Sequence, residues 1–197
     1  VLHEDAIFPV RAAGIPVNIK NTNQPEDRGT MIVSESAEHC DHIITGIAGK
    51  KGMSVINIEK DKMNSEIGFG KNVLRALEKS NVSFEHMPSG VDTMSVVIAT
   101  EALAGKETAI IDEIKSRVHP DQIYIESNLA LIAVVGRGMK SARGTAAILF
   151  SALADARVNI KMIDQGSSEL NIIVGVEEED FEVAIKAIYK RFIGINQ

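Results

Sequence analysis

Apolar positions repeat along this chain at an interval of 76 residues. Residues 53–98 align without a gap on residues 129–174, and each copy opens with an apolar run typical of a strand, Met53–Ile58 and Leu129–Val135. A loop with glycine and serine follows, and apolar side chains then recur at the spacing of one helix face. These are Val73, Leu74 and Leu77 in the first copy and Ile148, Leu149, Ala152 and Leu153 in the second. The pattern indicates an internal repeat.

Each copy continues with two short strand-like runs and a second helix. The runs are separated by a tight turn at Ser89-Gly90 or Gln165-Gly166, where glycine would supply a positive φ. The second helix is expected at Lys106–Val118 in one copy and at Phe181–Phe192 in the other. The order strand, helix, strand, strand, helix, strand predicts an α+β fold of two ferredoxin-like βαββαβ units in tandem.

The closing strand distinguishes the two copies. The first can use Gln122–Glu126, but the second has only five residues left after Phe192. The unassigned apolar run Ile43–Ala48 is the available substitute, so we expect the first unit to be inserted in the second. The predicted division is a strand for the second unit at 43–49, the first unit at 50–127 and the second unit at 128–197.

Residues 1–33 differ in texture from the repeats. A helix is expected at Glu4–Ala13 and strands at Ile15–Ile19 and Met31–Val33, around the turn-rich residues 21–30. This piece buries too little to fold alone and is predicted to be the remnant of a preceding domain, joined to the repeats by a polar linker at 34–42. The chain also begins at Val1, in mid-pattern and without methionine, which predicts that it is part of a longer protein.

Composition narrows the classes of partner. Of 197 residues 45% are hydrophobic, the net charge is -6, and aromatic residues make up 4% with no tryptophan. A negative surface with few stacking platforms argues against nucleic acid, and no apolar run is long enough to cross a bilayer. The single cysteine, Cys40, fits a reducing cytoplasm, and the scattered histidines predict no metal site.

The loops that enter the first helix of each copy are the first candidates for chemistry. They comprise residues 63–70 and 136–144. Unpaired N–H groups at a helix start, with the helix dipole, can bind a carboxylate or phosphate. The plain alternative is a helix start capped by Ser65 or Ser141. Gly136-x-Gly138 is not a dinucleotide fingerprint, because its third glycine would fall at Gly144, three positions too late.

The segments after these helices, residues 81–85 and 157–161, are the second candidates. We expect each to lie beside the loop, so that Ser83 or Asn159 and nearby carbonyls receive an ammonium while helix amides hold a carboxylate. That combination suits a free amino acid. Glu85 could favour a cationic side chain, whereas Lys161 stands at the matching place in the second copy. Alternatively, Glu85 points to solvent on an edge strand.

The sequence resembles the tandem ACT domains at the C-terminus of aspartate kinase. The segments that carry the resemblance are residues 134–141 (Val-Val-Gly-Arg-Gly-Met-Lys-Ser) and 159–163 (Asn-Ile-Lys-Met-Ile). Val1-Leu2-His3, Ile15-Pro16-Val17, Asn21-Thr22, Pro25 and Gly29-Thr30 resemble the end of that enzyme's α/β amino-acid-kinase domain. In this family the first ACT unit is inserted in the second.

The resemblance implies an allosteric sensor in the cytoplasm. The whole enzyme would use MgATP to phosphorylate the β-carboxylate of aspartate, the first step towards lysine, threonine and methionine. Because the family's nucleotide and aspartate residues lie mostly upstream, this part of the enzyme should be inactive alone, with no catalytic residues, metal or cofactor. Segment 85–92 looks closest to the lysine-responsive branch, and threonine or meso-diaminopimelate are the alternative effectors.

The family's effector-binding residues can be carried over by position. In the first unit they are Met63, Ser65, Gly68, Phe69, Gly70, Ser83, Phe84, Glu85 and Ser89, and in the second Met139, Ser141, Gly144, Asn159 and Ile160. Family members pair their ACT units across a two-fold axis, which implies a homodimer. A ligand-free dimerisation module is the rival interpretation, and an RNA-binding ferredoxin-like domain is disfavoured by charge and aromatic content.

Overall fold

The computed structural model describes residues 4–33 and 43–194, and the chain divides into two compact bodies, Val1–Asp41 and His42–Gln197. The smaller body contains helix α1 (Glu4–Ala12) and the antiparallel strands β1 (Val17–Ile19) and β2 (Thr30–Ile32), as expected from the sequence. The predicted linker, 34–42, lies outside the described residues. Within the described part, no helix is long and apolar enough to span a membrane.

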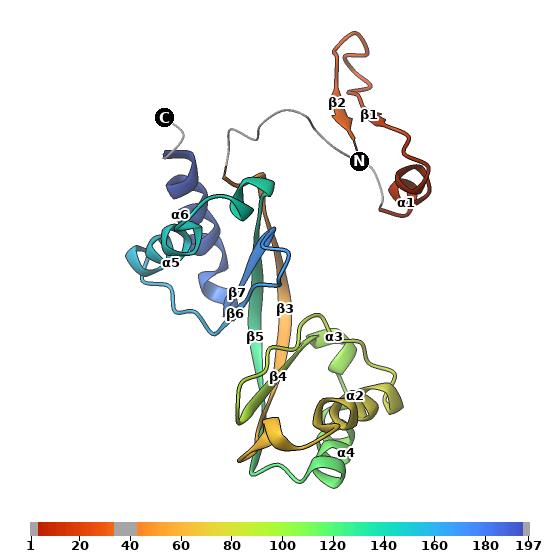
Figure 1. The fold of residues 1–197 in the computed structure, drawn as a ribbon, viewed down its shortest axis with the longest axis vertical. Coiled ribbons are helices and arrows are strands. Elements are labelled where there is room, and N and C mark those ends of the chain that lie inside the picture. Colours follow the sequence, from red (N-terminus) through yellow and green to blue (C-terminus); the bar gives the residue numbers. More distant parts are fainter. Residues whose placement is uncertain (1–3, 34–42, 195–197) are drawn as a thin grey trace. The chain divides into compact units, whose positions relative to one another are not determined.

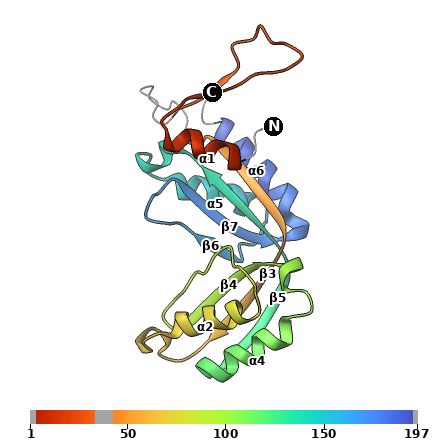
Figure 2. The ribbon, with the colours of Figure 1, turned by 90° about the vertical axis from the view of Figure 1, so that its right-hand side faces the viewer.

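The larger body contains both βαββαβ units and is built on one five-stranded sheet with the order β4-β3-β5-β7-β6 (Figures 1 and 2). Helices α2 and α4 lie together beside one half of the sheet, and α5 and α6 lie beside the other half. The prediction of an α+β fold with two ferredoxin-like units is confirmed. In chain order the elements are β3 (Gly46–Glu59), η1 (Met63–Ser65), α2 (Phe69–Lys79), β4 (Thr93–Ala99), α3 (Thr100–Leu103), α4 (Glu107–Val118), β5 (Gln122–Val135), η2 (Arg137–Lys140), α5 (Thr145–Asp155), β6 (Met162–Asp164), β7 (Asn171–Glu177), η3 (Glu178–Asp180) and α6 (Phe181–Gly194).

Strands β3 and β5 run through both halves of this sheet. The sequence suggested two strands in each region, but each pair of runs forms one antiparallel strand of 14 residues. The first half of β3 pairs with the second half of β5, from Gly46 opposite Val135 to Lys50 opposite Leu131. The second half of β3 pairs with β4 and with the beginning of β5. The second unit therefore takes its missing strand from before the first unit, whereas the predicted limits at 42, 49 and 127 stay predictions.

Both long strands are interrupted at equivalent places. Gly52 and Asn128 are 76 residues apart, and both have left-handed backbones, with φ of 73° and 62°. The register between β3 and β5 shifts on either side of Met53. Such bulges increase local twist, so the sheet bends where one unit gives way to the other.

Burial on both faces explains why the strands read as mainly apolar runs. In β3, Ile56 and Ile58 pack under α2 and α4, while Met53 and Val55 point to the opposite face. On that face they meet Leu129 and other apolar side chains of the second half, in a small core shared by the two units. A strand that is covered on both sides needs apolar residues at successive positions.

The two copies differ in the turn between the two strand-like segments that follow the first helix. β4 begins at Thr93 and β7 at Asn171, so the interval is 78 residues there, and the ungapped alignment is wrong beyond the turn. Neither Gly90 nor Gly166 has a positive φ, contrary to expectation; in the second turn Glu169 does, at 56°. In the first copy the expected strand is reduced to isolated bridges, from His86 to Val97 and from Ser89 to Met94, because Pro88 between them has no N–H to donate.

Candidate functional site

The loop after β3 is fastened to the beginning of β4. The N–H of Lys60 donates to the carbonyl of Asp92 at 2.9 Å, and the N–H of Lys62 donates to the carboxylate of Asp92 at 2.8 Å. The N–H of Asn64 donates to the carbonyl of Val91 at 3.1 Å. These bonds place the loop and the start of α2 at the Asp92 end of the sheet.

Both first helices begin at a glycine in the left-handed region. Gly68 and Gly144 each have a φ of 85°, and neither helix has a side-chain cap. The proposed serine caps are wrong: Ser65 Oγ donates to the carbonyl of Lys62 at 2.7 Å, and Ser141 Oγ donates to that of Gly138 at 3.3 Å. Each serine therefore closes the 3₁₀ turn before the helix and leaves the helix amides uncapped.

The first turns of these helices have main-chain donors to spare. Within the described residues, the N–H groups of Gly70 and Lys71 in α2 have no hydrogen-bond partner, and neither do those of Ala146 and Ala147 in α5. Such groups carry partial positive charge and point out of the helix start. A carboxylate or phosphate is the ligand that they would accept.

Apolar anchors and one ion pair fix the first loop. Met63 and Phe69 are 4% and 3% exposed. Lys60 lies over the ring of Phe69, 5.8 Å from its centroid, pairs with Glu66 and donates to the carbonyl of Val118 at 2.5 Å. Ile67, in contrast, is fully exposed beside Gly68. The loop is anchored at its base and exposes Gly68 to solvent.

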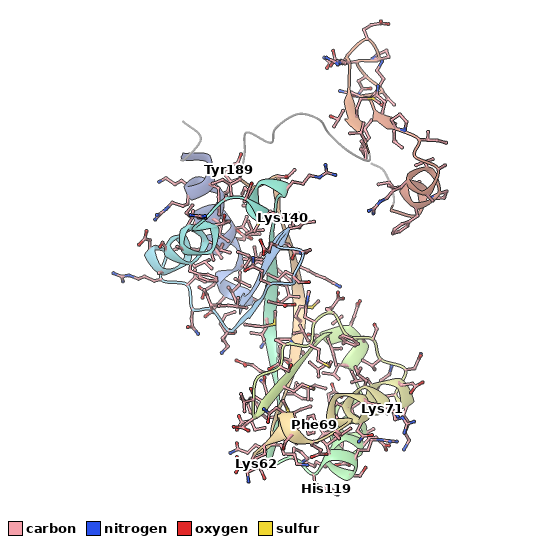
Figure 3. All side chains as sticks on the ribbon, viewed as in Figure 1. Lys62, Phe69, Lys71, His119, Lys140 and Tyr189 are labelled. Carbon is pink, nitrogen blue, oxygen red and sulfur yellow. The ribbon has the colours of Figure 1, made fainter. Side chains whose placement is uncertain are left out.

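The second loop borders a cavity of about 500 Å³. Met139, Ser141 and Gly144 line it, as the sequence suggested, together with Lys140, Ala142, Arg143, Thr145, Ala146, Gln165, Glu169 and Ile172. Lys140 and Arg143 have no ionic partner in the described part of the chain. The corresponding positions of the first loop are Asn64 and Ile67, so the second loop is more cationic. Figure 3 shows Lys140 at the opposite end of this body from Lys62 and Phe69.

The two parts of each predicted site do not meet within one chain, and the expectation that they lie side by side is wrong. The N–H of Glu85 donates to the carbonyl of Val97, whereas the loop is bound to Val91 and Asp92. Five residues of strand, about 16 Å, separate these points. Ser83 and Phe84, next to Glu85, therefore lie away from the loop with it, and only Ser89 lies towards the loop end.

The second unit repeats this separation. The N–H of Lys161 donates to the carbonyl of Gly175, while the loop is bound through Gly136 to Leu170. Asn159 and Ile160, which precede Lys161, do not line the cavity. The reason lies in the fold: a strand, a helix and a parallel strand begin and end at alternating ends of the sheet, so the second strand starts far from the loop that follows the first.

Glu85 does not simply point to solvent. Its Oε1 lies 2.6 Å from Nζ of Lys50, and its side chain is 40% exposed. At the matching place Lys161 is paired with Glu126 and lies 3.1 Å from Glu177. Hydrogen bonds to Glu126 and then to Glu177 raise the pKa of Lys161 above its ordinary value.

Sequence reasoning missed Lys50 and Glu126 as members of these clusters. Both fall near the middle of long strands, where the sequence suggested a break between separate strands. A signal was nevertheless present: under the 76-residue interval Lys50 corresponds to Glu126 and Glu85 corresponds to Lys161. Two charge reversals that compensate one another are typical of residues in contact.

Comparison with known proteins identifies relatives of the whole chain. A family profile described as an ACT domain matches residues 132–192. Aspartokinase 3 of Bacillus subtilis is 42% identical over 193 residues, which are 98% of this chain and 42% of that protein. The crystal structure of Clostridium acetobutylicum aspartate kinase, described as an important allosteric enzyme, has a TM-score of 0.90 and 56% identity over 98% of this chain and 45% of its own.

A more distant match has the same fold. Aspartokinase III of E. coli, in complex with lysine and aspartate in a T-state, has a TM-score of 0.76 at 21% identity, over 98% of this chain and 42% of its own. The chain spans less than half the length of each of these relatives.

Proposed function

Because this chain belongs to the aspartate kinase family and matches its C-terminal regulatory ACT region, we propose that it binds an end-product amino acid, lysine, for feedback inhibition. The whole enzyme would convert ATP and L-aspartate, with Mg²⁺, into ADP and 4-phospho-L-aspartate in the cytoplasm. The catalytic groups would belong to the part of the enzyme that precedes this chain.

The observation that carries this proposal is the uncapped start of α2 behind Gly68. Its free amides suit the carboxylate of an amino acid, and the exposed carboxylate of Glu85 suits a side-chain ammonium. The E. coli relative was crystallised with lysine. Lysine is the common amino acid that carries both an α-carboxylate and a side-chain ammonium. Met63, Ser65, Phe69, Gly70 and Ser89 would shape the loop end, and Ser83 and Phe84 the strand end.

The separation of these two groups within one chain requires a second copy. A two-fold axis beside segment 85–90, which bonds to the outer side of β4, would bring the loop of one copy next to the strand start of the other, so that one lysine touches both. Edge strands with unpaired backbone groups favour such pairing. The functional form would therefore be a homodimer, with lysine bound between the first units.

Inhibition then follows by linkage. A ligand shifts a conformational equilibrium only by the difference in its affinity for the two states. If the inhibited arrangement of two copies binds lysine more tightly than the active one, a coupling free energy of about 1–3 kcal/mol is typical. The second unit, with Met139, Ser141 and Gly144 on a cavity, would be a further amino-acid site of different selectivity.

Isothermal titration of the 197-residue chain tests the proposal. Lysine should bind, and threonine and meso-diaminopimelate should bind more weakly. The Glu85→Gln substitution should lower the affinity for lysine by at least about fivefold. Sedimentation of the same samples should show that lysine favours the dimer. A dimer that is silent towards all three amino acids would replace this function with a ligand-free dimerisation module.

A further inference from the structure

One ion pair of the first unit recurs in the second with its charges exchanged. Lys50 Nζ lies 2.6 Å from Glu85 Oε1. At the equivalent positions, 76 residues later, Glu126 is paired with Lys161. Each pair joins a long strand to the segment that follows the first helix of a unit, and each connects the two halves of the sheet. Equivalent places in the two units therefore hold opposite charges.

The two pairs differ in how firmly the cation is held. Lys161 lies against two carboxylates, those of Glu126 and Glu177, and its side chain is 25% exposed. Within the described residues Glu85 has Lys50 as its one ionic partner, and the two side chains are 40% and 55% exposed. Exposed pairs have little net stability because water and salt compete for both partners. Another cation can therefore replace Lys50 on Glu85 at small cost.

We propose that Lys50 is an internal competitor of the effector: its ammonium occupies on Glu85 the place that the side-chain ammonium of bound lysine takes. This inference rests on the function proposed above. Lys50 thereby sets the affinity for cationic amino acids without touching the bound ligand. In the second unit the tethered cation is Lys161, and two carboxylates keep it in place, so that unit has no equivalent position for a ligand ammonium.

The competition also has a structural consequence. Lys50 lies on the half of β3 that pairs with β5 in the second unit, opposite Leu131, whereas Glu85 belongs to the first unit. When lysine displaces Lys50, it removes one of the ionic links between the units. The pair is thus a selectivity element and a contact that changes with occupancy.

The test is titration calorimetry on the full 197-residue chain and its Lys50→Met variant, which keeps the length of the side chain and removes its charge. Without the competitor, lysine should bind about two- to fivefold more tightly, a range set by the strength of exposed ion pairs. Threonine has no side-chain cation and should bind both proteins equally. Glu126→Gln, at the equivalent position of the second unit, is the matched control and should leave lysine affinity unchanged.

The outcomes separate the competitor from the function. If Lys50→Met binds lysine no more tightly, while Glu85→Gln weakens it and both variants melt near the wild-type temperature, Lys50 is not a competitor and the lysine site stands. If lysine binds Glu85→Gln as tightly as it binds wild type, the role of Glu85 falls and this inference falls with it. Equal tightening by Glu126→Gln would overturn the inference too, because loosening of the two units would explain both effects.

Discussion

Replacing Gly68 with alanine tests the helix start on which the proposed site depends. Among the described residues other than Ile67 and Phe69, no heavy atom lies within 4 Å of the position where a Cβ would stand, so an added methyl group has space. The cost is conformational: at a φ of 85° an L-residue loses about 1–2 kcal/mol. Alanine also restricts the unfolded chain, and this stabilises the folded state by about 0.4–1 kcal/mol. The expected net destabilisation is therefore about 1 kcal/mol.

Gly166→Ala is the matched control. This glycine also has open space around it, but its φ is not positive, so only the gain of about 0.4–1 kcal/mol from the unfolded chain applies. The two variants should therefore differ by about 1–2 kcal/mol in urea unfolding, or about 2–8 °C in melting temperature. Gly68→Ala should also lower the affinity for lysine, because relief of the backbone strain moves the N–H groups at the start of α2. Equal stabilities for the two variants would refute the left-handed helix start.

Two further predictions concern the second unit. Gly49→Ala should destabilise the chain by about 1–3 kcal/mol, because the added Cβ would lie 2.4 Å from Cζ of Phe181. Gly46→Ala is the control, since the described residues leave space for a Cβ there. Similar urea midpoints for the two variants would contradict the close packing of Gly49 on Phe181. Lys161→Met should lose a stabilisation that wild type has below the ordinary pKa of 10.5 and loses as pH rises through the raised folded pKa. The difference in urea midpoint between wild type and this variant should therefore shrink as pH rises above 10.5. A difference independent of pH, or an equal trend for Lys140→Met, whose cation has no ionic partner among the described residues, would argue against the ion pair.

Periodicity predicted the helices and most strand positions well because it reflects which side chains are buried. The expected helix Lys106–Val118 is α4, Glu107–Val118, and its side chains at 110, 114 and 118 form the buried stripe. The short helix α3 was missed because four residues give no periodicity. The two long strands appeared broken because glycine and polar residues such as Gly52 and Asn128 usually mark turns. In the folded chain they form bulges within a continuous strand.

The candidate site was harder to predict because it depends on which end of the sheet a segment occupies. Sequence located the loops, the glycines and the segment around Glu85, but not the five residues of strand that separate Val97 from Asp92. The alternation of a strand, a helix and a parallel strand already implies that separation. The partner of Glu85 could not be inferred without knowing that β3 is continuous, because Lys50 is 35 residues away in sequence.

The continuity of β3 and β5 also limits how the two units can communicate. Their backbones cross from one unit to the other, and the apolar side chains of Met53, Val55 and Leu129 are buried between the units on the face away from the helices. A hinge at that point would expose this core, at about 25 cal/mol for each Å² of apolar surface. Polar links at its margin, such as His86 with Asp164 at 2.9 Å and Lys50 with Glu85, can exchange partners without that cost. A ligand that acts on one unit is therefore expected to alter these marginal contacts and the pairing between copies, and to leave the shared core intact.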